Sequence, residues 1–260
     1  TIRGDDGDDT LDGGEGRDII LGDGAANTPG VDNLYGNEGD DGDDLYGLWG
    51  NAGDDYLYGG LGDDEIEGGD GNDAIYGETG LSLGSGETAG DDTILGENGA
   101  DVLRGEGGND SIYGMAHNDT IYGGAGSDSI NGGDGDDTIY GEDGDDYLAG
   151  HDGADTISGG NDDDLIWGDA GNDTLYGNAG EDQIDGGGGA DTLSGGDDAD
   201  LLIDHSTGTL DDLTGGAGND ILDCYNGVTD TTADGAAGGS GTDTFYIDDI
   251  DLNDAASPEA

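Results

Sequence analysis

A nine-residue repeat runs through most of this 260-residue chain. From Gly96 to Ile203, twelve consecutive units follow one another without insertion, each with Gly at the first place, Asp at the sixth and Leu or Ile at the eighth. The fourth place is Gly in nine of the twelve units, the exceptions being His117, Asp162 and Asp198. A biased composition alone would not hold one phase over twelve units, so the pattern indicates a stacked repeat architecture.

The same unit recurs outside this block, at Gly4–Asp12, Gly13–Leu21, Gly50–Tyr58, Gly59–Glu67, Gly68–Tyr76, Gly215–Asp223 and Gly238–Tyr246. Each stretch between these units can be aligned as one unit with extra residues, which brings the total to about 24 units. We therefore expect a single domain over residues 1–250 and an irregular tail over 251–260, with loop insertions near residues 24–30, 36–49, 81–90, 204–214 and 224–237.

Each unit divides into a turn and a short strand. Its first six residues are rich in Gly, Asp and Asn, which tolerate positive φ and form tight turns. Its last three alternate, with only the middle residue apolar, as in a strand with one buried face. A chain that turns after every strand alternates between two sheets, so two units make one coil and the period along each sheet is eighteen residues. The sequence predicts an all-β fold, a parallel β-roll of two sheets with about 12 coils.

The charge of the chain works against such a fold. It carries 66 acidic and only 3 basic residues, a formal net charge of −63, together with 62 glycines. This composition is typical of a disordered chain. The negative charge argues against polyanionic nucleic acid as a partner, and no apolar run is long enough for a membrane span. The remaining alternatives are a disordered acidic chain and a chain that folds around cations.

In a β-roll the sixth-place Asp residues would stack in two columns, with neighbours about 4.8 Å apart. Unscreened, each neighbouring pair would repel by roughly 3–4 kcal/mol at an effective dielectric near 20, so the coil cannot close without cations between its turns. Carboxylates and turn carbonyls are hard oxygen donors, which favour Ca²⁺. We expect about ten ions within the regular block and roughly 15–20 Ca²⁺ ions in the whole chain.

The unit resembles the nonapeptide Gly-Gly-x-Gly-x-Asp-x-(Leu/Ile/Phe)-x of the RTX (repeats-in-toxin) family. Residues 132–140 match it fully, as do Gly123–Asn131 and Gly238–Tyr246. The resemblance covers about residues 4–246 and implies a parallel β-roll that binds Ca²⁺ through the sixth-place Asp and turn carbonyls. It also implies a secreted bacterial protein. Because residues 247–260 show no evident C-terminal export signal, we expect an internal fragment of a larger protein.

By this resemblance the calcium ligands are the sixth-place residues Asp9, Asp18, Asp55, Asp64, Asp73, Asp92, Asp101, Asp110, Asp119, Asp128, Asp137, Asp146, Asp155, Asp164, Asp173, Asp182, Asp191, Asp200, Asp220 and Asp243. The turns that contain His117, Asp162 and Asp198 lack a fourth-place Gly, and with it the φ freedom that the motif uses.

Other motifs predict no catalytic residue. Gly80–Gly84 satisfies the G-x-S-x-G pattern around Ser82, but it lies in an insertion with no helix expected after it. His117, His151 and His205 form no metal-binding pair in the sequence, and we expect them to be exposed turn residues. Cys224 is expected to be a partly buried thiol. The sequence therefore predicts that the chain is not an enzyme.

One outward surface can be interpreted in two ways. On alternate units the seventh place is Thr120, Thr138, Thr156, Thr174 and Thr192, and the ninth place is mostly Tyr or Ser. Threonine and tyrosine suit exposed strands and stack across them, which is a structural explanation. The functional alternative is a flat Thr/Tyr surface that binds carbohydrate, ice or another copy of the chain.

The function predicted from these observations is a calcium-binding structural β-roll of a secreted or cell-surface protein, such as an adhesin, a surface layer or an extracellular scaffold. The chain would fold on binding Ca²⁺ outside the cell. The alternative is a C-terminal folding and export module of a secreted enzyme, such as a protease, lipase or polysaccharide epimerase. An ice- or carbohydrate-binding surface is a third option.

Overall fold

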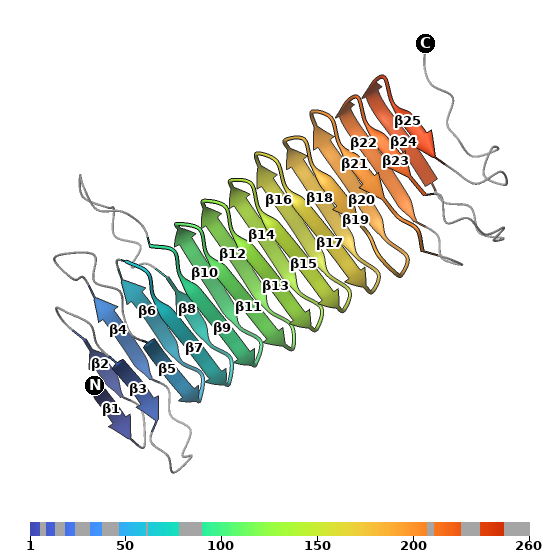
Figure 1. Cartoon of the computed structure of the whole chain (residues 1–260). Helices are drawn as coiled ribbons and strands as arrows, with labels where there is room; N and C mark the ends of the chain where they lie inside the picture. The colour runs from blue at the N-terminus through green and yellow to red at the C-terminus, as the bar shows by residue number, and fades with distance from the viewer. Residues whose placement is uncertain are drawn as a thin grey trace. The chain divides into compact units, whose positions relative to one another are not determined.

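The computed structural model describes residues 1–5, 9–13, 19–23, 32–37, 47–60, 62–77, 90–206, 211–224 and 235–246, and these residues contain 25 β-strands (Figure 1). They divide into two compact units, Thr1–Asp134 and Gly135–Ala260, which are described separately. Within the described ranges no helix is long and apolar enough to cross a membrane. The tail 251–260 and much of every predicted insertion lie outside these ranges, and the single domain over 1–250 stays a prediction.

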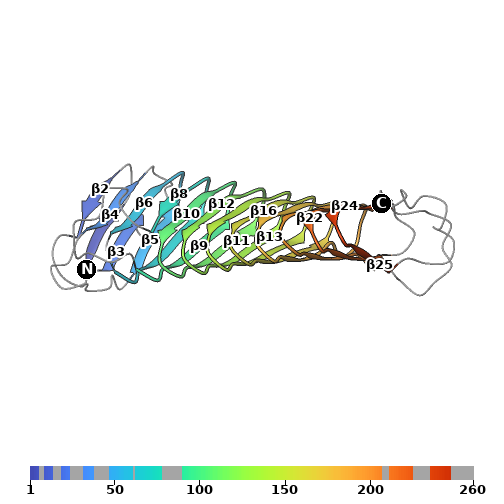
Figure 2. The same cartoon turned by 90° about the horizontal axis from the view of Figure 1, so that it is seen from above.

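In the first unit, consecutive strands alternate between two parallel sheets (Figures 1 and 2). One sheet contains, in order, β1 (Ile2–Asp5), β3 (Ile19–Asp23), β5 (Gly47–Ala52), β7 (Glu65–Asp70), β9 (Thr93–Asn98), β11 (Ser111–Ala116) and β13 (Ser129–Asp134). The other contains β2 (Thr10–Asp12), β4 (Asn33–Asn37), β6 (Tyr56–Gly60), β8 (Ala74–Tyr76), β10 (Val102–Gly107) and β12 (Thr120–Ala125).

The second unit repeats this topology. One sheet contains β14 (Thr138–Asp143), β16 (Thr156–Asn161), β18 (Thr174–Ala179), β20 (Thr192–Asp197), β22 (Asp212–Gly218) and β24 (Gly235–Gly241). The other contains β15 (Tyr147–Asp152), β17 (Leu165–Ala170), β19 (Gln183–Asp185), β21 (Leu201–Ile203), β23 (Ile221–Asp223) and β25 (Thr244–Tyr246). The predicted all-β parallel β-roll with two sheets is confirmed.

The pairing register confirms the eighteen-residue period. Ser111 pairs with Ser129, and Thr156 pairs with Thr174. Where the repeat is irregular, the extra residues leave the strands in phase. Glu65 pairs with Thr93, ten residues beyond the regular spacing, because the insertion near 81–90 lies between them. Each irregular stretch that two paired strands flank is therefore one unit with an insertion.

The strands are longer than the predicted three residues. A complete strand such as β16 has six, made of the last three places of one unit and the first three of the next. Its ladder with β14 continues past the glycine at the first place, through Glu142↔Gly160 and Asp143↔Asn161. Only the fourth to sixth places remain for the turn. The prediction was wrong here because glycine-rich sequence was assigned to turns by propensity alone, whereas inter-strand hydrogen bonding keeps it in the sheet.

The core of each of the two compact units is the column of eighth-place side chains from its nine-residue repeats. Ile121 and Ile157, for example, have no exposed surface, whereas the seventh- and ninth-place residues beside them are half-buried or exposed. Each coil contributes one eighth-place side chain per sheet, which is Leu or Ile as far as Leu222 and is Ala236 and Phe245 in the last described strands, so the apolar core is one side chain wide on each sheet. The rest of the interior holds carboxylates.

The three fourth-place exceptions keep a turn with positive φ. His117, Asp162 and Asp198 have φ angles of 82°, 74° and 71°. Asp and His are among the residue types that occur most often in the left-handed region outside glycine. The absence of a fourth-place glycine therefore leaves these turns in place.

Replacement of a first-place glycine should lower the free energy of unfolding far more than replacement of a glycine with open space around its Cα. A Cβ on Gly141 would lie 2.2 Å from Asp146 Oδ2 and 2.6 Å from Gly159 O. We expect Gly141→Ala to lower the free energy of unfolding by about 1–3 kcal/mol through overpacking, measured by denaturant titration in saturating calcium.

The matched control for this variant is Gly188→Ala. A Cβ at Gly188 would meet only Asp169 O, at 3.8 Å. This variant should change the free energy of unfolding by less than about 0.5 kcal/mol, as surface substitutions usually do. Equal losses for the two variants would contradict the close fit of carboxylate to glycine.

Candidate metal centres

The sixth-place aspartates lie inside the coil, at the ends of the eighth-place core. Asp155 and Asp173 are each 1% exposed. The following sixth-place aspartates are likewise buried, with at most 5% of their surface exposed: Asp55, Asp64, Asp73, Asp92, Asp101, Asp110, Asp119, Asp128, Asp137, Asp146, Asp164, Asp182, Asp191, Asp200 and Asp220. Asp9 and Asp243 are half-buried, and Asp18 lies outside the described residues. So many buried carboxylates demand either protons or cations.

These aspartates are joined by a ladder of hydrogen bonds along the coil axis of each unit. The backbone N–H of Asp155 donates to Oδ1 of Asp173 at 2.8 Å, and that of Asp173 donates to Oδ1 of Asp191 at 2.8 Å. The first unit has the same contacts, from Asp73 to Asp101 at 2.7 Å and from Asp101 to Asp119 at 2.8 Å. One oxygen of each carboxylate in the ladder therefore fixes the turn of the preceding coil.

The second carboxylate oxygen points toward the first-place glycine of the same unit. A Cβ on Gly168 would lie 2.5 Å from Asp173 Oδ2 and 2.5 Å from Gly186 O, the carbonyl of the next first-place glycine. Oδ2 of Asp73, Asp101, Asp155, Asp164, Asp173, Asp182 and Asp200 is buried and accepts no hydrogen bond. A carboxylate oxygen and a carbonyl oxygen thus converge where the glycine leaves room.

Burial raises the pKa of these aspartates, because it disfavours the charged carboxylate. Burial, together with the neighbouring charges of Asp146 and Asp182, raises the pKa of Asp164 to about 8, against a hydrogen bond from the backbone of Asp146 that lowers it. The pKa of Asp73 rises to about 7 and that of Asp101 to about 6, in both cases mainly through burial. The carboxylate form is disfavoured unless a cation compensates it.

The donor set fits calcium. The buried oxygens belong to carboxylates and backbone carbonyls, which are the hard ligands that Ca²⁺ takes in groups of six to eight. The sixth-place aspartates are the residues that would hold the ion. Their exact ligand roles stay a prediction.

The two columns also contain two aspartates that the sequence analysis did not assign. Asp32 and Asp211 are buried, and their Oδ1 atoms accept the backbone N–H of Asp9 and Asp191, at 2.9 and 3.0 Å. Each directly precedes a residue triplet with a central Leu, at Leu34 and Leu213. This signal was present in the irregular stretches, and counting back from the leucine would have found both.

A second, exposed ladder runs through the fifth place. Oδ1 of Asp136 accepts the backbone N–H of Ala154, and Oδ1 of Asn172 accepts that of Ala190, at 2.9 and 2.8 Å. The direction is opposite to the inner ladder, because here the earlier coil supplies the side chain. Fifth-place Asp and Asn therefore fasten successive turns from outside, a role that the sequence analysis missed.

The remaining candidate groups give no catalytic arrangement among the described residues. His117, His151 and His205 are exposed, as expected, but His151 lies in strand β15 and not in a turn, because strand pairing extends through the second place of the repeat. His151 lies 3.4 Å from Asp169, and His205 lies 3.3 Å from Asp223. Cys224 is buried. The G-x-S-x-G match at Gly80–Gly84 lies outside the described residues.

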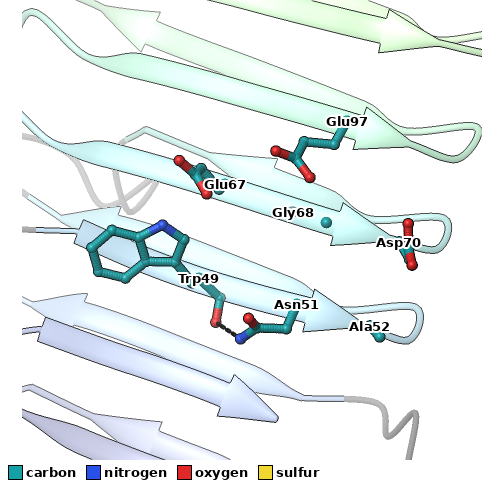
Figure 3. Close-up of a pocket in the computed structure, with 8 residues that line it drawn as sticks. Trp49, Asn51, Ala52, Glu67, Gly68, Asp70 and Glu97 are labelled. Carbon is teal, nitrogen blue, oxygen red and sulfur yellow. Dashed lines mark hydrogen bonds between the residues drawn. The ribbon is translucent and has the colours of Figure 1, made fainter. Parts of the chain in front are cut away.

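A polar hollow on the outer face of the first unit is separate from the aspartate columns. Trp49, Glu67 and Glu97 line it from the neighbouring strands β5, β7 and β9 (Figure 3). Burial raises the pKa of Glu67, the charge of Glu97 adds to this rise, and a hydrogen bond from Trp49 opposes it. The hollow contributes no residue to the buried ladders.

Comparison with known proteins agrees with this geometry. The chain matches the family described as RTX calcium-binding nonapeptide repeat (4 copies) over residues 1–29, 49–80, 88–116, 113–148, 140–175, 149–184, 167–202 and 207–224. The chain belongs to this family. Its repeats bind calcium and form a structural β-roll, which confirms the resemblance found in the sequence. No curated protein matches the chain.

The metal-depleted RTX chain should be most stable in acid. The raised pKa values mean that the folded state binds protons more tightly than the unfolded state, whose Asp pKa is about 3.9. This contribution to stability is fully present below about pH 4 and is lost as the pH rises through the folded pKa values of about 6 to 8.

Circular dichroism of resin-depleted protein between pH 4 and pH 8 measures this loss. We expect the β-sheet signal of the metal-free chain to fall across this range, and saturating calcium to restore it at pH 8. A metal-free chain equally folded at both ends of the range would contradict the pKa shifts.

Proposed function

We propose that the chain is a non-enzymatic structural segment that folds as Ca²⁺ fills its turns. The observation that carries this proposal is the row of buried carboxylate oxygens that accept no hydrogen bond, each facing a first-place glycine. A buried charge without compensation is strongly destabilising. Calcium in the turns would convert the same groups from a destabilising set into the links between coils.

Folding and binding are then one event. Without calcium, a chain of net charge −63 with an apolar core one side chain wide on each sheet stays extended. With roughly 15–20 bound Ca²⁺ ions the net charge would fall to about −30. Since the unfolded chain offers no preformed site, the binding free energy becomes folding free energy.

This coupling suits a protein that acts outside the cell. The RTX repeat family is typical of secreted bacterial proteins. In calcium-poor cytoplasm an extended polyanion would remain competent for export, and millimolar calcium outside would lock it. We therefore place the chain in an adhesin, surface layer or extracellular scaffold. If a catalytic domain adjoins this segment in the complete protein, the segment is instead the folding and export module of a secreted enzyme.

Calcium should switch the chain from extended to folded at pH 7.5. In excess chelator we expect a disordered circular dichroism spectrum and a large hydrodynamic radius. Calcium at millimolar concentration should produce a β-sheet spectrum and a compact particle, whereas equal magnesium should not, because Mg²⁺ dehydrates reluctantly. A β-rich spectrum in excess chelator at this pH would sink the proposal.

We also propose a binding role for the outward Thr/Tyr surface of the second unit. Thr138, Thr156, Thr174 and Thr192 align in register on β14, β16, β18 and β20. They are half-buried or exposed. A flat, regular row of hydroxyl and methyl groups is suited to an extended ligand such as carbohydrate or ice, or to another copy of the chain.

The ninth-place tyrosines of the first unit stack on one another, which supports a structural role for the ninth-place column. Tyr58 stacks between Tyr35 and Tyr76, with ring centroids 5.1 and 4.9 Å apart and interplanar angles of 4° and 6°. The Arg104 guanidinium lies 3.9 Å from the centroid of Tyr122 in the same sheet. The faces of these rings contact one another. We therefore assign the proposed ligand surface to the threonines.

The double variant Thr138→Lys with Thr156→Lys tests the threonine surface. It should abolish adsorption to polysaccharide or ice and leave calcium-dependent folding unchanged, because both side chains point outward. The control is Leu165→Lys with Gln183→Lys, which adds the same charge at the same place on the other sheet. Adsorption that survives in the threonine variant would exclude this surface.

A further inference from the structure

The repeat breaks after Ile203, and an aspartate takes the place of the expected glycine. Asp204 follows the regular block directly and so occupies the first place of the irregular stretch 204–214. In all twelve preceding units that place is Gly. The side chain of Asp204 is nevertheless buried, with 2% of its surface exposed. An extra carboxylate therefore enters the space that glycine leaves open elsewhere.

Asp204 meets two sixth-place aspartates in this space. Oxygens of Asp191, Asp204 and Asp211 lie within 4.8 Å of one another, and all three residues are buried. In the part of the chain that the structure describes, no other three His, Cys, Asp or Glu side chains converge in this way. The regular turns thus bring fewer carboxylates together than this irregular one.

Hydrogen bonds hold the three side chains but leave two oxygens over. Oδ1 of Asp191 accepts the backbone N–H of Asp173, Oδ1 of Asp204 accepts that of Ser206, and Oδ1 of Asp211 accepts that of Asp191, at 2.8, 2.9 and 3.0 Å. The Ser206 hydroxyl donates to Asp211 Oδ2 at 2.9 Å. Asp191 Oδ2 and Asp204 Oδ2 are buried and accept no hydrogen bond.

The two remaining oxygens point at one spot. A Cβ placed on Gly186 would lie 2.6 Å from Asp204 Oδ2 and 2.9 Å from Asp191 Oδ2. Two buried oxygens of like charge converge there without a donor, and the third carboxylate stands beside them. Since these hydrogen bonds fix the orientation of the three side chains, the arrangement is preorganised for a cation with hard ligands.

We propose that Asp191, Asp204 and Asp211 form a three-carboxylate site for one Ca²⁺ ion that fills at lower calcium concentration than the regular turns. The inference rests on the proposed function, because Ca²⁺ would fill both the three-carboxylate site and the regular turns. Affinity in calcium sites rises with the number of charged ligands and with rigidity. The turn that looks like a defect in the repeat is then its tightest site.

Calcium titration of metal-depleted protein, followed by calorimetry in competition with a chelator, tests this assignment. In the unmodified chain we expect a tightest class of one ion. Asp204→Asn should weaken that ion by at least about tenfold, and Asp204→Gly, which restores the first-place residue of the repeat, should convert the site to a regular turn. Circular dichroism at saturating calcium reports folding of both variants.

Asp197→Asn is the matched control, since it removes the same charge from an exposed position of the same unit. A tightest class that persists in Asp204→Asn and Asp204→Gly, as it should in Asp197→Asn, would overturn the three-carboxylate site and leave the proposed function standing. An unmodified chain that binds no calcium would overturn both. Selective loss of one tight ion in the two Asp204 variants supports the site.

Discussion

The structure depends on a close contact between a carboxylate and a glycine. In regular units such as that of Gly168 and Asp173, the sixth-place Asp points inward and places one oxygen so near the first-place Gly that a Cβ there would overlap it. Its other oxygen fastens the turn of the preceding coil through a backbone N–H. This contact closes the turn, stacks the coils and buries charge in the same place. The carboxylate therefore needs a bound cation or a proton, because it cannot reach water.

This contact explains why the apolar core can be so thin. One Leu or Ile on each sheet per coil, such as Ile157, is less than an ordinary domain buries. The missing cohesion would come from ions between the turns, which is why the composition of the chain is typical of disorder while its repeat is typical of a fold. In the proposed function calcium is therefore part of the protein interior, and the folded fraction of the chain depends on the calcium concentration.

The irregular stretches show how tolerant the coil is outside that contact. The ten extra residues in the sequence between β8 and β9 leave the ladder Glu65↔Thr93 in phase, because they fall between two strands and not within one. His117, Asp162 and Asp198 adopt positive φ and hold their turns without a fourth-place glycine. Among the described residues, Asp204 is a break in the repeat that reaches the interior, and it adds a carboxylate to the buried row of aspartates.

The nine-residue period by itself determined the parallel β-roll, the eighteen-residue register, the buried column of Leu and Ile and the two columns of inward Asp. A strict short period has one stacked solution, since each place must recur in the same environment in every coil. Asp32 and Asp211 were also within reach of the sequence, because each precedes a triplet with a central Leu.

Only the tertiary structure decided what depends on hydrogen bonds and contacts between coils. These are the extension of the strands through the first three places, the outer ladder of fifth-place Asp136 and Asn172, and the meeting of Asp204 with Asp191 and Asp211. Asp204 has no counterpart in the repeat, so no pattern could assign it. Its side chain stands at a first place, and the repeat by itself does not show that a first-place side chain meets the sixth-place carboxylates of two successive turns.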